Sequence, residues 1–230
     1  LDTDALTCEY ELSGGATTAA TAWYKDTDPL MALYLPMEGG ESNALLDFSG
    51  NNVGVTAVDN PTWLADGGHD GNGAFELYDQ YLDAGENFPT YSSYTKTAWI
   101  RLNAYSANNI ITGDTNGGGH ALWTRNEGNT TLSAGHNGTW TYVKDTSPLS
   151  LNTWYFVAVT FDYESGEMIL YRDGNPVNFG SVPEDARNVT DETLLIGAFG
   201  GGYLMRGKID DARVYAHVLS PQQILAMYNG

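Results

Sequence analysis

Two adjoining stretches near the end of the chain decide the fold: residues 207–215 read GKIDDARVY and residues 219–225 read LSPQQIL. The first stretch predicts a final β-strand, and the second predicts a short capped helix. Ser220 is a good N-cap, Pro221 suits the first helical position, and Gln223 stands where a capping box needs its second partner. The helix would then fold an apolar face back onto a sheet.

The composition is that of one large all-β domain with an acidic surface. The 230 residues include 27 glycines and 15 tyrosines, as expected for strands joined by turns. Ten Lys and Arg against 29 Asp and Glu give a net charge of −19, which repels a phosphate backbone and favours divalent cations. The sequence also lacks an apolar run of about 18 residues. We therefore expect no nucleic acid partner and no membrane insertion.

Several earlier segments read as strands and turns that lead up to this ending. Two of them, residues 94–102 and 151–162, are apolar on both alternating faces. Such strands belong at the centre of a stacked sheet whose outer face is also covered by another segment. The remaining segments are DFSGNN at 47–52, HDGNGAFEL at 69–77 and MILYRDGNPV at 168–177.

In their order and spacing, these segments and the final GKIDD strand resemble the laminin-G-like, concanavalin A-like jelly-roll domains. The resemblance covers roughly residues 30–230 and implies an all-β jelly-roll sandwich with a short C-terminal helix. It also implies an extracellular or cell-surface location, because that family is largely extracellular. Most of its members are not enzymes.

Residues 1–29 differ from the rest and predict two short strands. Cys8 and Trp23 resemble the B and C strands of an immunoglobulin-like domain; a plain N-terminal extension of the jelly roll is the alternative. An unfinished sandwich has unpaired strand edges that another chain can satisfy. We expect Leu6, Cys8, Leu12, Trp23 and Tyr24 to contact another copy of the chain or a neighbouring surface domain.

This edge leads to the first functional hypothesis, a non-enzymatic structural or adhesion module. Subunits joined head to tail through the N-terminal segment would form a filament unless the rotation closes a ring. Catalysis is not expected, because the related hydrolases carry a Glu-x-Asp-x-x-Glu triplet on one strand, and this sequence has none.

The resemblance also implies a structural calcium ion between the first and last strands. Hard cations take several carboxylate and carbonyl oxygens. The residues carried over are Glu38, the carbonyl of Gly40, Asp47, and Asp210 or Asp211. The alternative is a solvated acidic rim without an ion.

The second functional hypothesis is a calcium-dependent carbohydrate-binding module. Lectins stack sugars on exposed aromatic rings and bind hydroxyls with polar side chains. A polar and aromatic set on neighbouring predicted hairpin strands could line the concave face of a sheet; the alternative is that its tryptophans only cover the sheet. The set consists of His120, Trp123, Arg125, His136, Trp140 and Tyr142.

Three sequons, at Asn129, Asn137 and Asn188, predict a glycoprotein. A glycan on Asn137 would block the face that is predicted to bind sugar.

Overall fold

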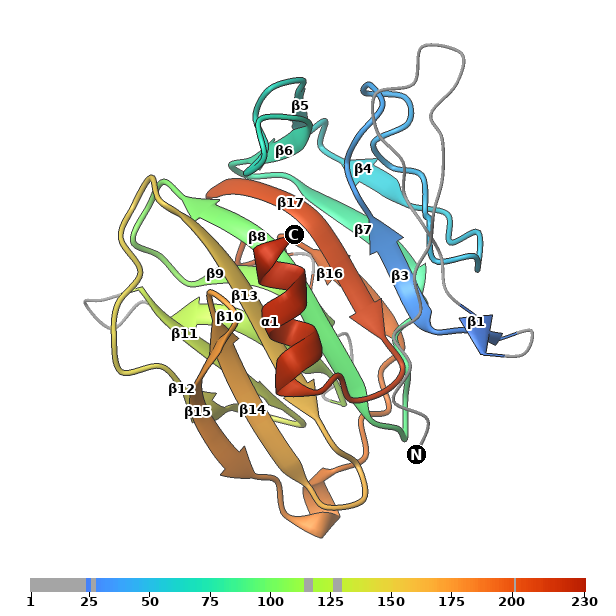
Figure 1. Cartoon of the computed structure of the whole chain (residues 1–230), viewed down its shortest axis with the longest axis vertical. Coiled ribbons are helices and arrows are strands. Elements are labelled where there is room, and N and C mark those ends of the chain that lie inside the picture. Colours follow the sequence, from blue (N-terminus) through green and yellow to red (C-terminus); the bar gives the residue numbers. More distant parts are fainter. Residues whose placement is uncertain (1–23, 26–27, 114–117, 126–129, 201) are drawn as a thin grey trace.

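A computed structural model describes residues 24–25, 28–113, 118–125, 130–200 and 202–230. Within these residues the chain is a sandwich of two antiparallel sheets with one short helix at the C-terminal end (Figure 1). This architecture confirms the predicted jelly roll. Of the predicted strands at residues 6–12 and 21–25, only Tyr24 and Lys25 are among the described residues, so the immunoglobulin-like segment stays a prediction.

One sheet, as far as the described residues define it, has seven strands. In spatial order they are β12 (Thr139–Lys144), β11 (Thr131–His136), β10 (His120–Arg125), β9 (Asn108–Gly113), β16 (Thr193–Ile196), β7 (Tyr81–Glu86) and β4 (Thr56–Val58).

The facing sheet is built around the two central strands β8 and β17. In spatial order its strands are β15 (Asn175–Ser181), β14 (Glu167–Arg172), β13 (Trp154–Phe161), β8 (Tyr94–Leu102), β17 (Gly207–Tyr215), β6 (Ala74–Leu77) and β5 (Thr62–Leu64), and β3 (Met31–Leu35) also pairs with β17. The remaining elements are the short pair β1 (Tyr24–Lys25) and β2 (Asp28–Pro29), the 3₁₀ turn η1 (Glu184–Ala186) and α1 (Pro221–Asn229).

The acidic pair in β17 lies where this strand changes partner. The first residues of β17 pair with β6, whereas Ala212 to Tyr215 pair with β3. The register against β8 shifts between Asp210 and Arg213, and Asp211 has a positive φ of 51°. This bulge bends the strand and brings the first strand of the domain beside the last.

The core alternates with the strand period. In β13, Val157 and Val159 face the other sheet, while Phe156 and Ala158 point outward and form a second cluster with Ile224 of α1. The helix lies across the outer face of this sheet (Figure 1). The prediction of central strands that are apolar on both faces and covered by another segment is therefore confirmed.

The helix begins as predicted. The Ser220 hydroxyl accepts a hydrogen bond from the Gln223 amide at 3.3 Å, and the Gln223 side chain accepts one from the Ser220 amide at 2.8 Å. Pro221 occupies the first turn, where its missing N–H costs nothing.

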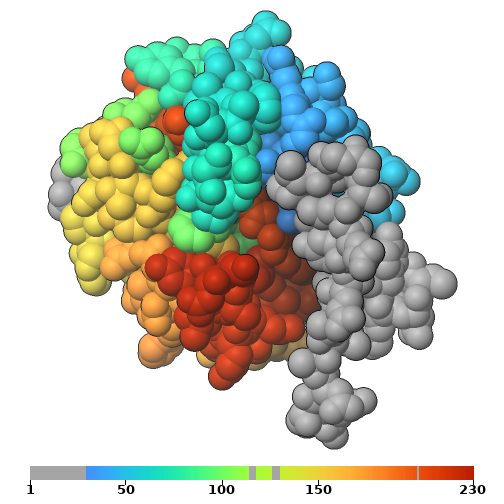
Figure 2. Space-filling model, turned by 45° about the horizontal axis from the view of Figure 1, so that its top comes forward, coloured from blue at the N-terminus to red at the C-terminus, as the bar shows by residue number. Residues whose placement is uncertain are grey.

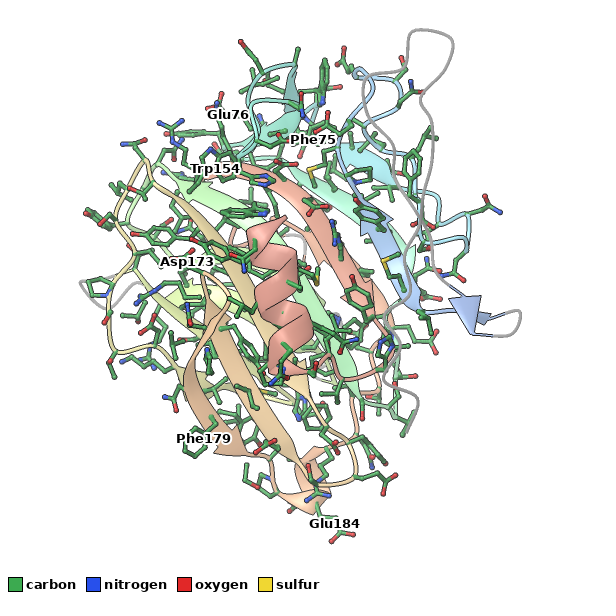
Figure 3. The ribbon with its side chains drawn as sticks, in the orientation of Figure 1. Phe75, Glu76, Trp154, Asp173, Phe179 and Glu184 are labelled. Carbon is green, nitrogen blue, oxygen red and sulfur yellow. The ribbon has the colours of Figure 1, made fainter. Side chains whose placement is uncertain are left out.

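Strands β12 and β15, at the ends of their sheets, lie side by side. Asn178 of β15 donates a hydrogen bond to the Lys144 carbonyl of β12 at 2.6 Å. The neighbouring Phe179 side chain projects from β15 into solvent and is 77% exposed (Figure 3).

Candidate carbohydrate pocket and cation region

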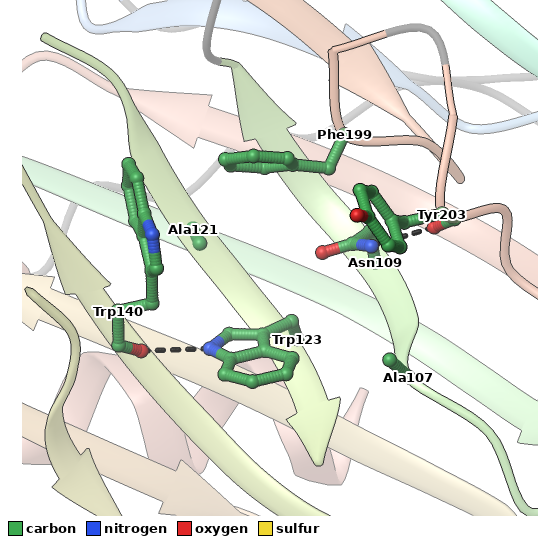
Figure 4. Close-up of a pocket in the computed structure, with 7 residues that line it drawn as sticks. All are labelled: Ala107, Asn109, Ala121, Trp123, Trp140, Phe199 and Tyr203. Atoms are coloured by element: carbon green, nitrogen blue, oxygen red, sulfur yellow. Dashed lines mark hydrogen bonds between the residues drawn. The ribbon is translucent and has the colours of Figure 1, made fainter. Parts of the chain in front are cut away.

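An aromatic pocket lies on the face of the seven-stranded sheet that points away from the core. It has a volume of about 320 Å³. Its walls come from β9, β10, β12 and the loop that follows β16 (Figure 4). The lining residues are Ala107, Asn109, Ala121, Trp123, Trp140, Phe199 and Tyr203.

Because side chains alternate along a strand, one face of β10 points toward this pocket. Ala121 and Trp123 line it, whereas Leu122 between them belongs to the core. Alanine at 121 leaves room that a larger side chain would fill. On the opposite side, the loop after β16 turns back on itself through two backbone hydrogen bonds between Phe199 and Gly202, at 2.8 and 2.9 Å.

The walls of the pocket are fixed to one another by hydrogen bonds. The Trp123 indole N–H donates to the Trp140 carbonyl at 2.7 Å, and the Asn109 amide donates to the Tyr203 carbonyl at 2.6 Å. The Trp140 and Phe199 rings meet edge to face, with centroids 5.0 Å apart. In Figure 4 the free oxygen of the Asn109 amide points toward the space between the rings. The pocket is therefore preformed, with aromatic walls, the Asn109 oxygen as an acceptor, and the Tyr203 hydroxyl, which can donate or accept.

Such a pocket can bind the C–H face of a sugar ring while accepting a hydrogen bond from a hydroxyl. Aromatic side chains supply large apolar contact area, and a few placed polar groups fix the orientation of the ligand. Of the predicted sugar-binding residues, Trp123 and Trp140 are brought together here.

The prediction is wrong for His120 and His136, because both side chains are buried in the core. They lie opposite each other on β10 and β11. His120 is three residues from Trp123, and an odd spacing on a strand places two side chains on opposite faces. Both imidazoles are therefore inaccessible to a sugar.

The two histidines belong to a buried basic cluster. The Lys96 amine lies 2.5 Å from Nδ1 of His120 and donates to the Ile111 carbonyl at 3.2 Å. Burial lowers the pKa of Lys96 well below its usual value, and burial together with Lys96 lowers the pKa of His120. Burial, with a further contribution from Lys96, lowers the pKa of His136 to about 4. Burial thus disfavours the charged form of all three groups inside the sandwich.

Arg125 and Tyr142 are both half-buried, and neither lines the pocket. The Tyr142 ring packs against the core and meets His136 edge-on, with ring centroids 5.6 Å apart. Sequence reasoning missed Asn109, Phe199 and Tyr203. The signal was the run FGGGY at residues 199–203, in which two aromatic residues flank three glycines.

A second candidate region lies at the end of the molecule where β6, β3 and β17 meet. Both Glu38 carboxylate oxygens accept a hydrogen bond from the Gly73 amide at 3.1 Å. Burial raises the pKa of Glu38, and the charges of Asp70, Asp210 and Asp211 raise it further. Figure 2 brings this end forward and shows the residues around 60–75 (teal) beside those around 30–45 (blue). The structure thus brings Glu38 and Asp210 together from opposite ends of the chain.

Asp210 is the buried member of this region, with 1% of its surface exposed. Burial raises its pKa, against the lowering effect of two hydrogen bonds from His69: from its ring at 2.8 Å and its amide at 3.1 Å. Ligand atoms of His69, Asp70 and Asp210 lie within 4.8 Å of one another. A Cβ on Gly68 would lie 2.6 Å from the Gly73 carbonyl oxygen and 2.8 Å from an Asp210 carboxylate oxygen. Carboxylate and carbonyl oxygens converge here beside one imidazole nitrogen, and the oxygens are donors that suit a hard cation.

Three of the predicted ligands have other roles. The Asp47 carboxylate accepts bonds from the amides of Tyr34, Ser49 and Val53 and from the Ser49 hydroxyl. The amide and the carbonyl of Tyr34 both pair with residues 47–48, so Asp47 lies along the edge of β3 that faces away from β17.

The other two of these predicted ligands interact with residues close to them in the sequence. The Gly40 carbonyl accepts the amides of Asn43 and Ala44 at 2.8 and 2.9 Å. Asp211 forms a two-pronged ion pair with Arg213, with its shortest contact at 2.7 Å. Of the expected ligands, Asp210 therefore belongs to the group whose ligand atoms converge, together with His69 and Asp70 of the glycine-rich loop, which the sequence did not indicate as ligands. Glu38 is outside that group and lies close enough for the charges of Asp70 and Asp210 to raise its pKa.

The sequons differ in accessibility. Asn137 donates its amide nitrogen, the atom that would carry a glycan, to the carbonyls of Ala186 and Asn188 at 2.7 and 2.6 Å. A glycan there would take one of the two amide hydrogens and so remove at least one of these hydrogen bonds, which argues against modification of Asn137. Asn188 is exposed and accepts a hydrogen bond from the Tyr163 hydroxyl at 2.6 Å through its oxygen. Asn129 lies outside the described residues.

Comparison with known proteins places the fold in a family. A sequence model of the concanavalin A-like lectin/glucanases superfamily matches residues 70–225. The chain therefore belongs to this superfamily. No curated protein matches the sequence, and none of the described helices is long and apolar enough to cross a membrane.

Solved structures agree with this placement. Domain 4 of AbnA, a GH43 extracellular arabinanase from Geobacillus stearothermophilus solved with arabinotriose, has a TM-score of 0.67 at 18% identity, over 86% of this chain and 98% of that one. The ligand binding domain of botulinum neurotoxin serotype D, solved with N-acetylneuraminic acid, has a TM-score of 0.67 at 23% identity, over 88% of this chain and 51% of that one. A pentraxin from Limulus polyphemus has a TM-score of 0.51 at 17% identity, over 61% of this chain and 71% of that one. At these identities the likeness concerns the fold.

Proposed function

We propose that this domain is a non-enzymatic, extracellular carbohydrate-binding module. The aromatic pocket on the outer face of the seven-stranded sheet is the observation that carries the proposal. Its tryptophans lie side by side on β10 and β12, and the Trp123–Trp140 hydrogen bond holds them in place before a ligand arrives. A preformed site loses little conformational entropy on binding.

The relatives support this proposal. The superfamily includes lectins, and the arabinanase domain and the toxin domain were both solved with a saccharide. The arabinanase is described as extracellular, which supports the proposed location.

The test is a glycan array followed by calorimetry with the best ligand. Trp140→Ala removes one wall of the pocket and keeps the carbonyl that holds Trp123. Loss of an aromatic contact worth about 1.4 kcal/mol corresponds to a tenfold weaker affinity, so we expect at least that loss. Phe179→Ala, which removes an exposed aromatic residue from the other sheet, is the matched control and should bind like the wild type. A wild-type protein that binds no glycan at millimolar concentration would refute the proposal.

We further propose that Glu38 and Asp210, with donors from the loop at 68–73, hold a structural calcium ion. Such an ion would neutralise carboxylates that now raise the pKa of Glu38 and would tie the first strand of the domain to the last.

Association through residues 1–29 stays a prediction, because most of that segment lies outside the described residues. It is compatible with sugar binding, since a surface module can both bind glycans and join its neighbours. Size measurements on a form that lacks residues 1–28 are the direct test. That form should stay folded and no longer associate.

A further inference from the structure

We infer that the aromatic pocket selects uncharged sugar residues and excludes acidic ones, such as uronic or sialic acids. This inference rests on the proposed function and adds the class of ligand. It follows from the chemistry of the pocket walls and from the charge of the whole chain.

Nothing that lines the pocket in the described part of the chain can balance an anion. Its seven side chains are alanine, asparagine, tryptophan, phenylalanine and tyrosine, and none of them is charged. The nearest cation along β10, Arg125, does not line the pocket and already has an interaction partner. A carboxylate placed among these rings would lose water without gaining an ion pair, and such burial is costly.

The hydrogen-bonding groups point to the same ligand. The Trp123 N–H is used by the Trp140 carbonyl, and the Asn109 amide donates to the Tyr203 carbonyl. The Asn109 oxygen that faces the pocket can only accept. It matches a sugar hydroxyl, which can donate, and it repels a carboxylate, which can only accept. The Tyr203 hydroxyl can donate or accept, so it does not distinguish the two ligands.

The size of the pocket and the charge of the chain also favour a short, uncharged ligand. A volume of about 320 Å³ lies at the lower end of the range for ligand pockets, so the site holds a short sugar segment rather than a long chain. The net charge of −19 makes the approach of polyanions unfavourable. This repulsion extends over about 8 Å at physiological salt, and over only about 3 Å at 1 M salt.

The experiment uses pairs of oligosaccharides in which one member is neutral and the other carries carboxylates. The pairs are β-1,4-linked mannan oligomers with β-1,4-linked mannuronate oligomers, and N-acetyllactosamine with its sialylated form. Affinity is measured for the full chain at 0.15 M and 1 M salt. In the pair with the tightest neutral member, we expect the neutral ligand to bind at least tenfold more tightly at both salt concentrations, and Trp140→Ala to abolish that binding.

A second experiment introduces a positive charge into the pocket lining. Ala107→Lys adds an ammonium to the lining, and we expect it to reduce the preference for the neutral member at least threefold. Phe179→Lys adds the same charge to the other sheet and should leave the preference unchanged.

The outcomes separate the two proposals. If an acidic ligand binds as tightly as its neutral partner, and Trp140→Ala removes both, carbohydrate binding stands and the exclusion of acidic sugars is refuted. If Ala107→Lys and Phe179→Lys change the preference equally, the selection does not arise in the pocket, and the inference fails. If no oligosaccharide of either class binds, the proposed function itself fails.

Discussion

At the scale of single residues, neighbouring positions on β10 face opposite sides of the sheet, one toward the pocket and one toward the core. Trp123 faces the pocket, whereas Leu122 and His120 face the other sheet. Both tryptophans were expected on a sugar-binding face, and both line the pocket. The two histidines were expected on the same face, but they are buried in the core. The alternation was readable from the sequence, because His120 and Trp123 are three positions apart, and an odd difference places two strand residues on opposite faces.

The buried histidine predicts an acid-sensitive fold. The pKa of His136 is lowered to about 4 from an ordinary value near 6.5. Between these two pKa values the unfolded chain binds a proton that the folded chain does not bind. The free energy of unfolding therefore decreases as the pH falls from about 6.5 to about 4. A difference of this size corresponds to about 3 kcal/mol. His136→Phe should remove that part of the pH dependence, measured by denaturant unfolding between pH 4 and 7.

Lys96→Met provides the comparison, because Lys96 is buried in the same cluster and the pKa of its amine is also lowered. Its unfolded pKa lies near 10.4, so its contribution to stability rises as the pH increases toward that value. Lys96→Met should flatten this alkaline limb, and His136→Phe the acidic one. If both variants keep the wild-type dependence of the free energy of unfolding on pH, in the acidic and in the alkaline range, these two groups are not its source.

At the scale of elements, α1 follows from its local sequence. The capping box, the proline and the terminal glycine mark its ends without reference to the rest of the chain. The sheet supplies what the helix covers, namely the outward cluster that contains Phe156 and Ala158.

Removal of the cap should weaken the fold by a measurable amount. Ser220→Ala loses the hydroxyl that accepts the Gln223 amide, and such a change costs about 1 kcal/mol. In a domain of this size the thermal midpoint should fall by about 2–4 °C. Gln222→Ala, at an exposed position in the same turn, should leave the midpoint unchanged. Equal midpoints for Ser220→Ala and the wild type would show that the cap adds nothing to stability.

At the scale of the whole molecule, the fold joins residues that are far apart in the chain. Glu38 and Asp210 come close enough to interact electrostatically because β6 pairs with β17 before its bulge and β3 pairs with β17 after it. An ion bound there only in the folded state stabilises the fold by mass action.

Chelation should therefore lower the thermal midpoint. At a calcium concentration 100 times its dissociation constant, the stabilisation is about 2.7 kcal/mol, or roughly 5–10 °C in a domain of this size. Glu38→Gln should abolish the difference between calcium and chelator. Asp66→Asn, at an exposed position just before the same loop, should retain it. Identical melting curves for the wild type with calcium and with chelator would exclude the ion.

The sequence by itself determined the all-β class, the order of the main strands, the capped helix and the two tryptophans of the pocket. These features depend on alternation, turn chemistry and capping, which act over a few neighbouring residues. The pocket as a whole was decided by tertiary structure. Asn109 and Tyr203 meet through a hydrogen bond across 94 residues, and no local pattern encodes that distance. The ligand set at Glu38 and Asp210 was likewise narrowed only when the bulge in β17 and the hydrogen bonds of Asp47 fixed where each carboxylate lies.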